Sequence, residues 1–179
     1  MRLHFETQQT IPFPVELVFA FFANPENLPR LMPAWQKARI EEAVFAPPPA
    51  LPKGAPAARL GVAAGTGTRL TLTFRPLPLF PMRWPWEARI EDFQWNKGFC
   101  DVQEQGPFVY WRHCHTIEAI EVNGRPGATL TDRVEYELPF ASVSHRLDGI
   151  LVRPQLARMF RFRQKRTLEL LGLITRHRT

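Results

Sequence analysis

The sequence predicts a single α+β domain in which a curved antiparallel sheet of about seven strands wraps around one long C-terminal helix. Apolar residues alternate with polar ones over most of residues 66–138, in short runs separated by tight-turn residues, which is typical of antiparallel strands. After Pro139 the apolar spacing becomes helical. Helical segments at both ends of a run of strands indicate an α+β fold rather than parallel βαβ units.

Length and composition indicate one globular domain over residues 1–179. The 179 residues can bury a sizeable core, and 45% of them are hydrophobic. The N-terminal stretch has no apolar leader, and no run approaches the roughly 20 apolar residues of a membrane-spanning helix. We therefore expect a cytoplasmic protein.

Cys100 and Cys114 lack CxxC spacing, so they indicate neither a disulfide framework nor a zinc site, and a reducing compartment is expected.

The first quarter of the chain predicts a strand, two short helices and a second strand. Residues 2–9 alternate as a strand does. Pro14 suits the first turn of a helix, where its missing N–H costs nothing, and Asn24 can cap a second short helix over residues 25–31. A strand follows near residues 35–45.

The middle of the chain predicts a loop and then five more strands. The Pro-rich stretch 46–56 cannot form a helix or a central strand, so an extended surface loop is expected. Gly65–Thr68 leads into a strand and is interpreted as a turn or bulge, since a phosphate cradle needs a helix N-terminus. The five strands are expected from about residue 66 to Pro76 and over residues 83–93, 99–105, 108–121 and 128–138, with turns at Asn96–Gly98, Gly106-Pro107 and Asn123-Gly124.

The C-terminal helix is predicted to be long, amphipathic and basic. Its apolar positions are Leu147, Ile150, Leu151, Leu156, Met159, Phe160, Leu168 and Leu171. Pro154 should kink it or split it near residue 153. Much of the net charge of +6 lies here, in Arg153, Arg158, Arg161, Arg163, Lys165, Arg166, Arg176 and Arg178. A solvated helix face is the preferred interpretation; an anionic ligand headgroup or weak contact with a membrane surface are alternatives, and no nucleic-acid partner is expected.

Three segments of the chain carry a family resemblance. Phe99–His115 reads FCDVQEQGPFVYWRHCH, Thr131–Phe140 reads TDRVEYELPF and Thr10–Phe22 reads TIPFPVELVFAFF. Together they resemble the bacterial SRPBCC (START-like) proteins of the cyclase/dehydrase and coenzyme Q-binding type, and most of all the branch labelled cell-division inhibitor. The resemblance implies a helix-grip (START/Bet v 1-like) fold with a cavity between the sheet and the last helix. It also implies a ligand such as a lipid, a polyketide or a quinone.

Alternation along the strands places polar and aromatic side chains on one face of the sheet. Side chains two apart in a strand share a face, so Asp101, His113 and Asp132 belong to three adjacent rows. The opposite face carries mostly charges, so the tryptophan–histidine face should line the concavity. Buried polar groups need partners, and an Asp101–His113 or an Asp132–His115 hydrogen bond would supply them. The expected ligand-binding residues are Trp86, Phe99, Asp101, Gln103, Trp111, His113, His115, Tyr136 and Phe160.

Three interpretations of these residues remain open. They can form a polar network in which each group has a hydrogen-bond partner and which supports the sheet. They can also orient the polar end of a mostly apolar ligand. They can also perform acid–base catalysis, with His113 or His115 as the base and Asp101 or Asp132 orienting it. No cofactor is expected. Two histidines at i, i+2 could hold a metal ion with Asp101, but no second cluster reinforces such a site, so no metal is expected.

The function predicted from the sequence is therefore binding of a small apolar or amphipathic molecule, without catalysis. A cyclase-, dehydratase- or hydrolase-like enzyme that uses the histidine–aspartate pairs is the first alternative. A regulatory protein-interaction domain, in line with the cell-division label of the resembled branch, is the second alternative.

Overall fold

The computed structural model describes residues 2–58, 60–76, 79, 81–139, 146 and 148–176. Its strands are β1 Leu3–Ile11, β2 Arg39–Val44, β3 Arg69–Phe74, β4 Trp84–Gln94, β5 Gly98–Gln105, β6 Tyr110–Val122 and β7 Arg125–Glu137. Its helices are α1 Val15–Ala23, the short 3-10 turns η1 Pro25–Asn27, η2 Pro29–Leu31 and η3 Ala34–Gln36, the π-helical η4 Asp148–Val152, and α3 Arg153–Arg176. The predicted helix position Leu147 and the basic residue Arg178 lie outside the described residues.

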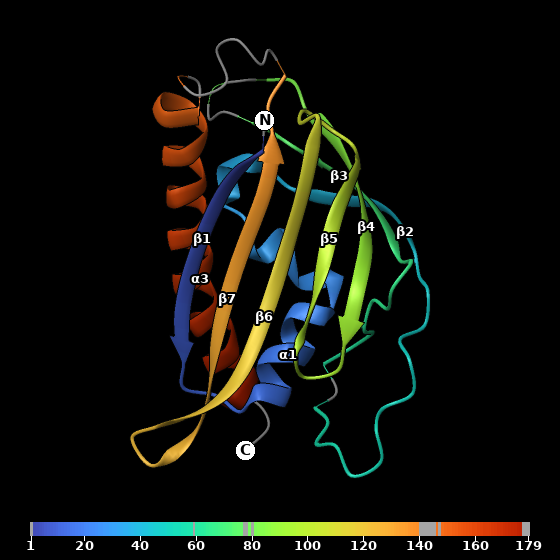
Figure 1. Ribbon diagram of the computed structural model, residues 1–179, viewed down its shortest axis with the longest axis vertical. Coiled ribbons are helices and arrows are strands. Elements are labelled where there is room, and N and C mark those ends of the chain that lie inside the picture. The colour runs from blue at the N-terminus through green and yellow to red at the C-terminus, as the bar shows by residue number, and fades with distance from the viewer. Residues whose placement is uncertain are drawn as a thin grey trace.

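The seven strands form one antiparallel sheet, as predicted, and their order is β1-β7-β6-β5-β4-β3-β2. The first and last strands are neighbours, because β1 pairs with β7 along its whole length. Figure 1 shows the curved sheet with α3 beside β1 and with α1 near the C-terminal end of α3. Helix α3 contacts β1, and α1 contacts β6 and β7. Both helices therefore cover the same side of the sheet.

The short helix predicted over residues 25–31 is present as separate 3-10 turns. Prolines at 25, 29 and 33 interrupt the chain, so it makes three separate 3-10 turns. Asn24 caps the first of them, since its side chain accepts a hydrogen bond of 3.1 Å from the Glu26 N–H. The third turn also shortens the strand predicted near residues 35–45, which begins only at Arg39.

Pro154 divides the C-terminal helical segment, as predicted. The π-helical turn η4 ends at Val152 and α3 begins at Arg153. η4 runs directly into α3, so the helix changes from π to α geometry beside Pro154, whose missing N–H cannot take part in the helical hydrogen-bond ladder.

The Gly65–Thr68 stretch is a turn, as predicted. The Gly67 N–H donates to the Ile90 carbonyl over 2.8 Å, and Thr66 Oγ1 accepts from the Phe93 N–H over 3.1 Å. The latter bond holds β4 where it bulges at Asp92, which has a φ of 51°. The Pro-rich stretch 46–56 is a loop, and the Trp95 indole donates to the Pro49 carbonyl over 2.7 Å.

The core consists of two apolar clusters, one at each end of the concave face. The first gathers side chains of α1, β1, β7 and the end of α3, among them Ile11, Phe19 and Leu171. The second joins the start of α3 to β1, β6 and β7 through residues such as Phe5 and Phe160. Polar side chains of β5, β6 and β7 lie between the two clusters.

Candidate functional site

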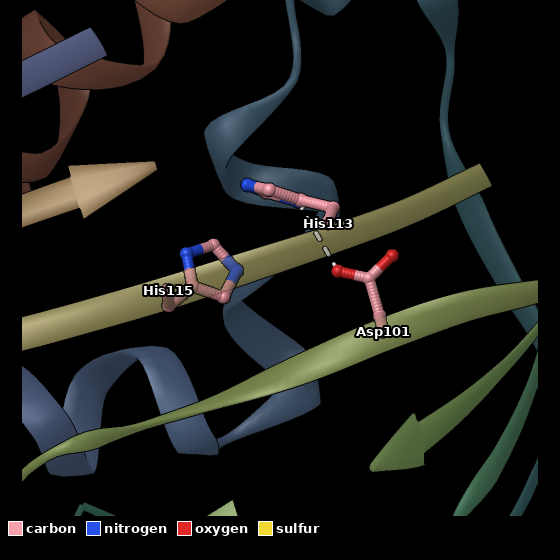
Figure 2. Close-up of side chains that lie close together, drawn as sticks. All are labelled: Asp101, His113 and His115. Carbon is pink, nitrogen blue, oxygen red and sulfur yellow. Dashed lines mark ion pairs between the residues drawn. The ribbon is translucent and has the colours of Figure 1, made fainter. Parts of the chain in front are cut away.

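The tryptophan–histidine face of the sheet points inward, as predicted. His113 and His115 are each 4% exposed and Asp132 is 2% exposed. The opposite face carries ion pairs in water, including Arg89–Glu104 at 2.7 Å. Figure 2 shows Asp101 on β5 facing the two histidines of β6.

The buried side chains form one continuous chain of contacts. His113 Nδ1 lies 3.1 Å from Asp101 Oδ2, and His113 Nε2 lies 2.9 Å from Asp132 Oδ1. His115 Nδ1 lies 2.7 Å from the same Asp132 oxygen, although it is not aligned as a hydrogen bond. At the far end, Arg163 Nη2 of α3 lies 3.4 Å from His115 Nε2. We call Asp101, His113, Asp132, His115 and Arg163 the ion network. Both predicted pairs, Asp101–His113 and Asp132–His115, are present in it.

The two carboxylates of the ion network stay ionised. Burial alone would raise the pKa of Asp132, but its contacts with His115 and His113 outweigh burial and hold that pKa far below its ordinary value. Burial also opposes ionisation of Asp101, and the neighbouring charge of His113 lowers the pKa of Asp101 overall.

The two imidazoles take opposite charge states. Burial would lower the pKa of His113, but Asp101 and Asp132 raise it overall, so both ring nitrogens donate to carboxylates. Burial and the charge of His113 lower the pKa of His115 to about 4, which leaves this ring neutral near pH 7. Two carboxylates are thus balanced by the His113 imidazolium and the Arg163 guanidinium.

Arg163 points into the protein, so the prediction that it lies on the solvated face of the helix is wrong. Its guanidinium lies 5.3 Å from the ring centroid of Phe22 and 5.9 Å from that of Phe160. By contrast, Arg158, Arg161 and Lys165 are exposed, as a solvated helix face requires. Contact of these cations with a membrane surface stays a prediction.

An aromatic wall continues the concave face beyond His113. It consists of Trp86, Phe108 and Trp111, with ring centroids of Trp86 and Trp111 5.1 Å apart and those of Phe108 and Trp111 4.8 Å apart. Trp111 is 6% exposed, and its indole nitrogen is buried without a hydrogen-bond partner. Trp84, which begins the same strand as Trp86, is 37% exposed and lies outside the core.

Two of the expected ligand-binding residues, Gln103 and Tyr136, already have hydrogen-bond partners within the protein. The Gln103 amide donates to the Phe108 carbonyl over 2.7 Å and accepts from the Phe108 N–H over 3.3 Å, so it holds the β5–β6 turn. The Tyr136 hydroxyl donates to the Asp148 carboxylate and ties the sheet to η4. Sequence alternation places both residues on the correct face but cannot show that their polar atoms are already bonded.

Removing the Tyr136 hydroxyl is expected to cost about 1–2 kcal/mol, because it leaves the buried Asp148 carboxylate short of a donor. The measurement is the free energy of unfolding of Tyr136→Phe in urea. Tyr110→Phe is the matched control, since Tyr110 is the other tyrosine of the chain and is partly exposed. Equal losses in both variants would contradict the structural role of the Tyr136 hydroxyl.

Phe99 and Phe160 pack against the two imidazoles of the ion network. The ring centroid of Phe99 is 4.8 Å from that of His115, and the Phe160 centroid is 5.4 Å from that of His113. Two hollows of about 440 and 420 Å³ lie among the described residues at the β6–β7 hairpin and beside the start of α1, away from the ion network. The expected cavity between sheet and helix therefore stays a prediction.

Asp101, His113 and His115 could hold a metal ion, because one ligand atom of each lies within 4.8 Å of the other two. The surroundings fit a cation poorly. Both nitrogens of His113 already face carboxylates, and the Arg163 guanidinium stands beside His115. The arrangement is better described as a charge-balanced network.

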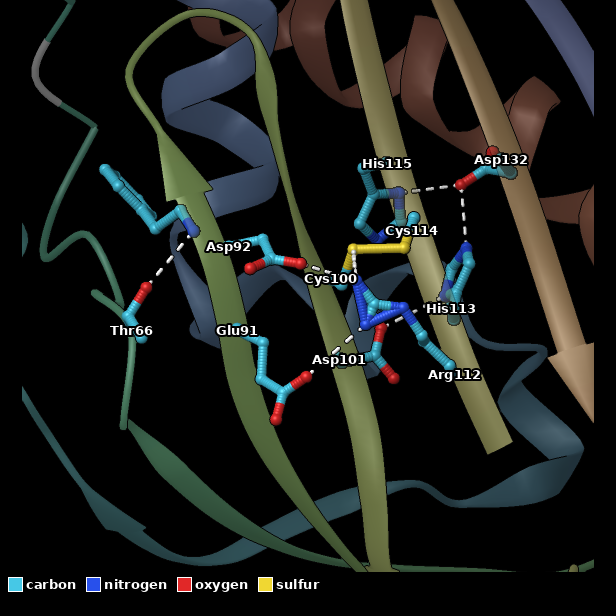
Figure 3. The surroundings of a disulfide bond; sticks show 11 residues. Thr66, Glu91, Asp92, Cys100, Asp101, Arg112, His113, Cys114, His115 and Asp132 are labelled. Carbon is cyan, nitrogen blue, oxygen red and sulfur yellow. Dashed lines mark hydrogen bonds and ion pairs between the residues drawn. A yellow bond between two sulfur atoms is a disulfide. The ribbon is translucent and has the colours of Figure 1, made fainter. Parts of the chain in front are cut away.

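Cys100 and Cys114 form a disulfide between β5 and β6, which corrects the sequence-based prediction (Figure 3). The two residues are directly opposite in the register. A two-residue turn at Gly106-Pro107 would set Cys100 opposite His113. The actual register is centred on Pro107, seven residues from each cysteine, and therefore sets the two cysteines opposite each other.

No protein-family model and no curated protein matches the chain in sequence. No described helix is long and apolar enough to cross a membrane. The resemblance to SRPBCC (START-like) proteins and to their cell-division branch stays a prediction.

Three solved structures share the architecture over 94% of this chain. Ara h 8.0201 has a TM-score of 0.56, 15% identity and 99% of its own chain covered. A point mutant of norcoclaurine synthase from Thalictrum flavum, in complex with a transition-state analogue, has a TM-score of 0.55, 16% identity and 96% covered. The protein TTHA0849 from Thermus thermophilus has a TM-score of 0.57, 13% identity and 99% covered. At these identities the likeness concerns the fold alone, and the chain has the Bet v 1-like helix-grip fold.

Proposed function

We propose that the protein binds a small apolar or amphipathic molecule on the concave side of the sheet, against the aromatic wall. The observation that carries this proposal is a pair of polar groups beside that wall. The Trp111 indole N–H is buried without an acceptor. The Asp101 side chain is 21% exposed, while its partner His113 is 5% exposed. Ligand sites are mostly apolar surfaces with a few polar groups that fix orientation.

The ion network supports binding better than acid–base catalysis. His113 has no free lone pair, because a carboxylate faces each of its nitrogens. His115 has one lone pair in its neutral form, but the Arg163 guanidinium faces it. A general base needs a nitrogen within reach of the substrate proton. We therefore assign the network a role in holding the concave face rigid behind the ligand.

The test is titration with 1-anilinonaphthalene-8-sulfonate, an amphipathic dye that fluoresces in apolar surroundings. The wild-type protein is expected to bind it, and Trp111→Phe to raise the Kd about five- to tenfold, since one hydrogen bond and part of the ring are lost. Trp84→Phe is the control, because Trp84 is exposed at the start of the same sheet face.

Absence of dye binding by the wild-type protein would end the proposal. Equal effects of both tryptophan substitutions would move the site away from the aromatic wall. Native mass spectrometry of the purified protein gives an independent measurement, in which a co-purified apolar molecule is expected and should be lost in Trp111→Phe.

A further inference from the structure

The disulfide links the same two strands that carry the first pair of the ion network. Cys100 pairs with Cys114 on the outer face, and the next residues in the register, Asp101 and His113, pair on the inner face. Figure 3 shows the sulfur atoms beside the Arg112 guanidinium. The covalent link and the buried ion pair therefore hold β5 and β6 together at one point.

The surroundings of the two sulfur atoms are unequal. Arg112 Nη2 lies 3.2 Å from Cys100 Sγ. Asp92 and Glu91 hold this guanidinium in place, at 2.5 and 3.4 Å. Cys100 is only 7% exposed, whereas Cys114 is partly exposed. A guanidinium beside a sulfur atom favours its thiolate form, so Cys100 is the better leaving group and Cys114 the more open target.

We propose that Cys100–Cys114 is a thiol–disulfide exchange site for a dithiol reductant. One thiolate of the reductant attacks Cys114 Sγ and forms a mixed disulfide. The electron pair of the broken bond stays on Cys100 as a thiolate beside Arg112. The second thiolate of the reductant then attacks its own sulfur in the mixed disulfide and releases the Cys114 thiolate, which takes a proton from water. The chain gains two electrons, and the dithiol leaves as a disulfide.

This site goes beyond ligand binding and does not depend on it. Reduction removes the covalent link next to the Asp101–His113 pair. Reduction of the disulfide on the outer face therefore makes the inner face around that pair less rigid.

The first test measures which sulfur is attacked in the wild-type protein. The oxidised protein is treated briefly with limiting glutathione, quenched with acid and digested, and the cysteine that carries glutathione is identified by mass. The adduct is expected on Cys114. An adduct found mainly on Cys100 would overturn the proposed direction of attack.

The second test measures the rate of reduction by dithiothreitol, followed by alkylation and mass. Arg112→Gln is expected to slow reduction about tenfold, because the leaving thiolate loses its cation. Arg89→Gln is the matched control, since Arg89 also pairs with Glu91, at 2.7 Å, on the same face. Equal rates in the wild-type and Arg112→Gln proteins would refute the role of Arg112, and circular dichroism verifies that both variants are folded.

Discussion

Replacing Asp132 by asparagine is expected to lower the free energy of unfolding by about 3–5 kcal/mol, the cost of removing one partner from a buried ionic cluster. The reason is the position of its carboxylate. One oxygen contacts His113 at 2.9 Å and His115 at 2.7 Å, and the side chain is 2% exposed. Without this charge, Asp101 alone faces the two cations of the ion network. Urea unfolding at neutral pH measures the loss.

The control for this substitution lies on the same strand and points outward. Among the described residues, Glu135 forms an ion pair with His4 alone, at 4.0 Å, and its side chain is 31% exposed. Glu135→Gln is expected to change stability by less than about 1 kcal/mol. A similarly small loss for Asp132→Asn would show that the ion network contributes little to stability. Apolar packing would then account for the stability of the concave face.

Alternation in the strands was enough to predict the inward face and its polar members. Period two places His113, His115 and Asp132 on one side, and the charged opposite face decides which side is buried. The Asn123-Gly124 hairpin sets Asp132 opposite His115, and the shared inner face brings Asp101 and His113 of adjacent strands together.

The rest of the network depends on distances that alternation does not contain. His113 is opposite Val134, so its second contact, with Asp132, is diagonal across the β6–β7 pair. Arg163 contacts His115 because α3 turns this side chain toward the sheet. In the sequence it is one of many cations of the helix, so its contact with the ion network cannot be recognised. The helix breaks at prolines were predictable in place but not in type, since a 3-10 turn and an α-helical turn share the same capping residues.

Stability is expected to peak near pH 6.5, the ordinary pKa of histidine, because the two buried histidines titrate in opposite senses. The folded-state pKa of His115 is lowered to about 4. Between pH 6.5 and 4 the unfolded chain therefore binds the extra proton. The free energy of unfolding should fall there by roughly 1.4 kcal/mol per pH unit as the pH drops. Asp101 and Asp132, whose folded pKa values are lowered, add to the loss in more acidic solution.

On the alkaline side the sign reverses, because the folded-state pKa of His113 is raised. Its stabilisation is complete below pH 6.5 and is lost as the pH rises through the folded value. Urea unfolding across pH 4–9 should therefore separate the two imidazoles. His115→Gln should flatten the limb between pH 4 and 6.5, and His113→Gln should remove the decline above pH 6.5. His4→Gln, with a side chain 62% exposed, should leave both limbs in place. Retention of the acid limb in His115→Gln would mean that this ring is not the buried neutral partner of Asp132, and the assignment of charge within the network would have to be exchanged between the two histidines.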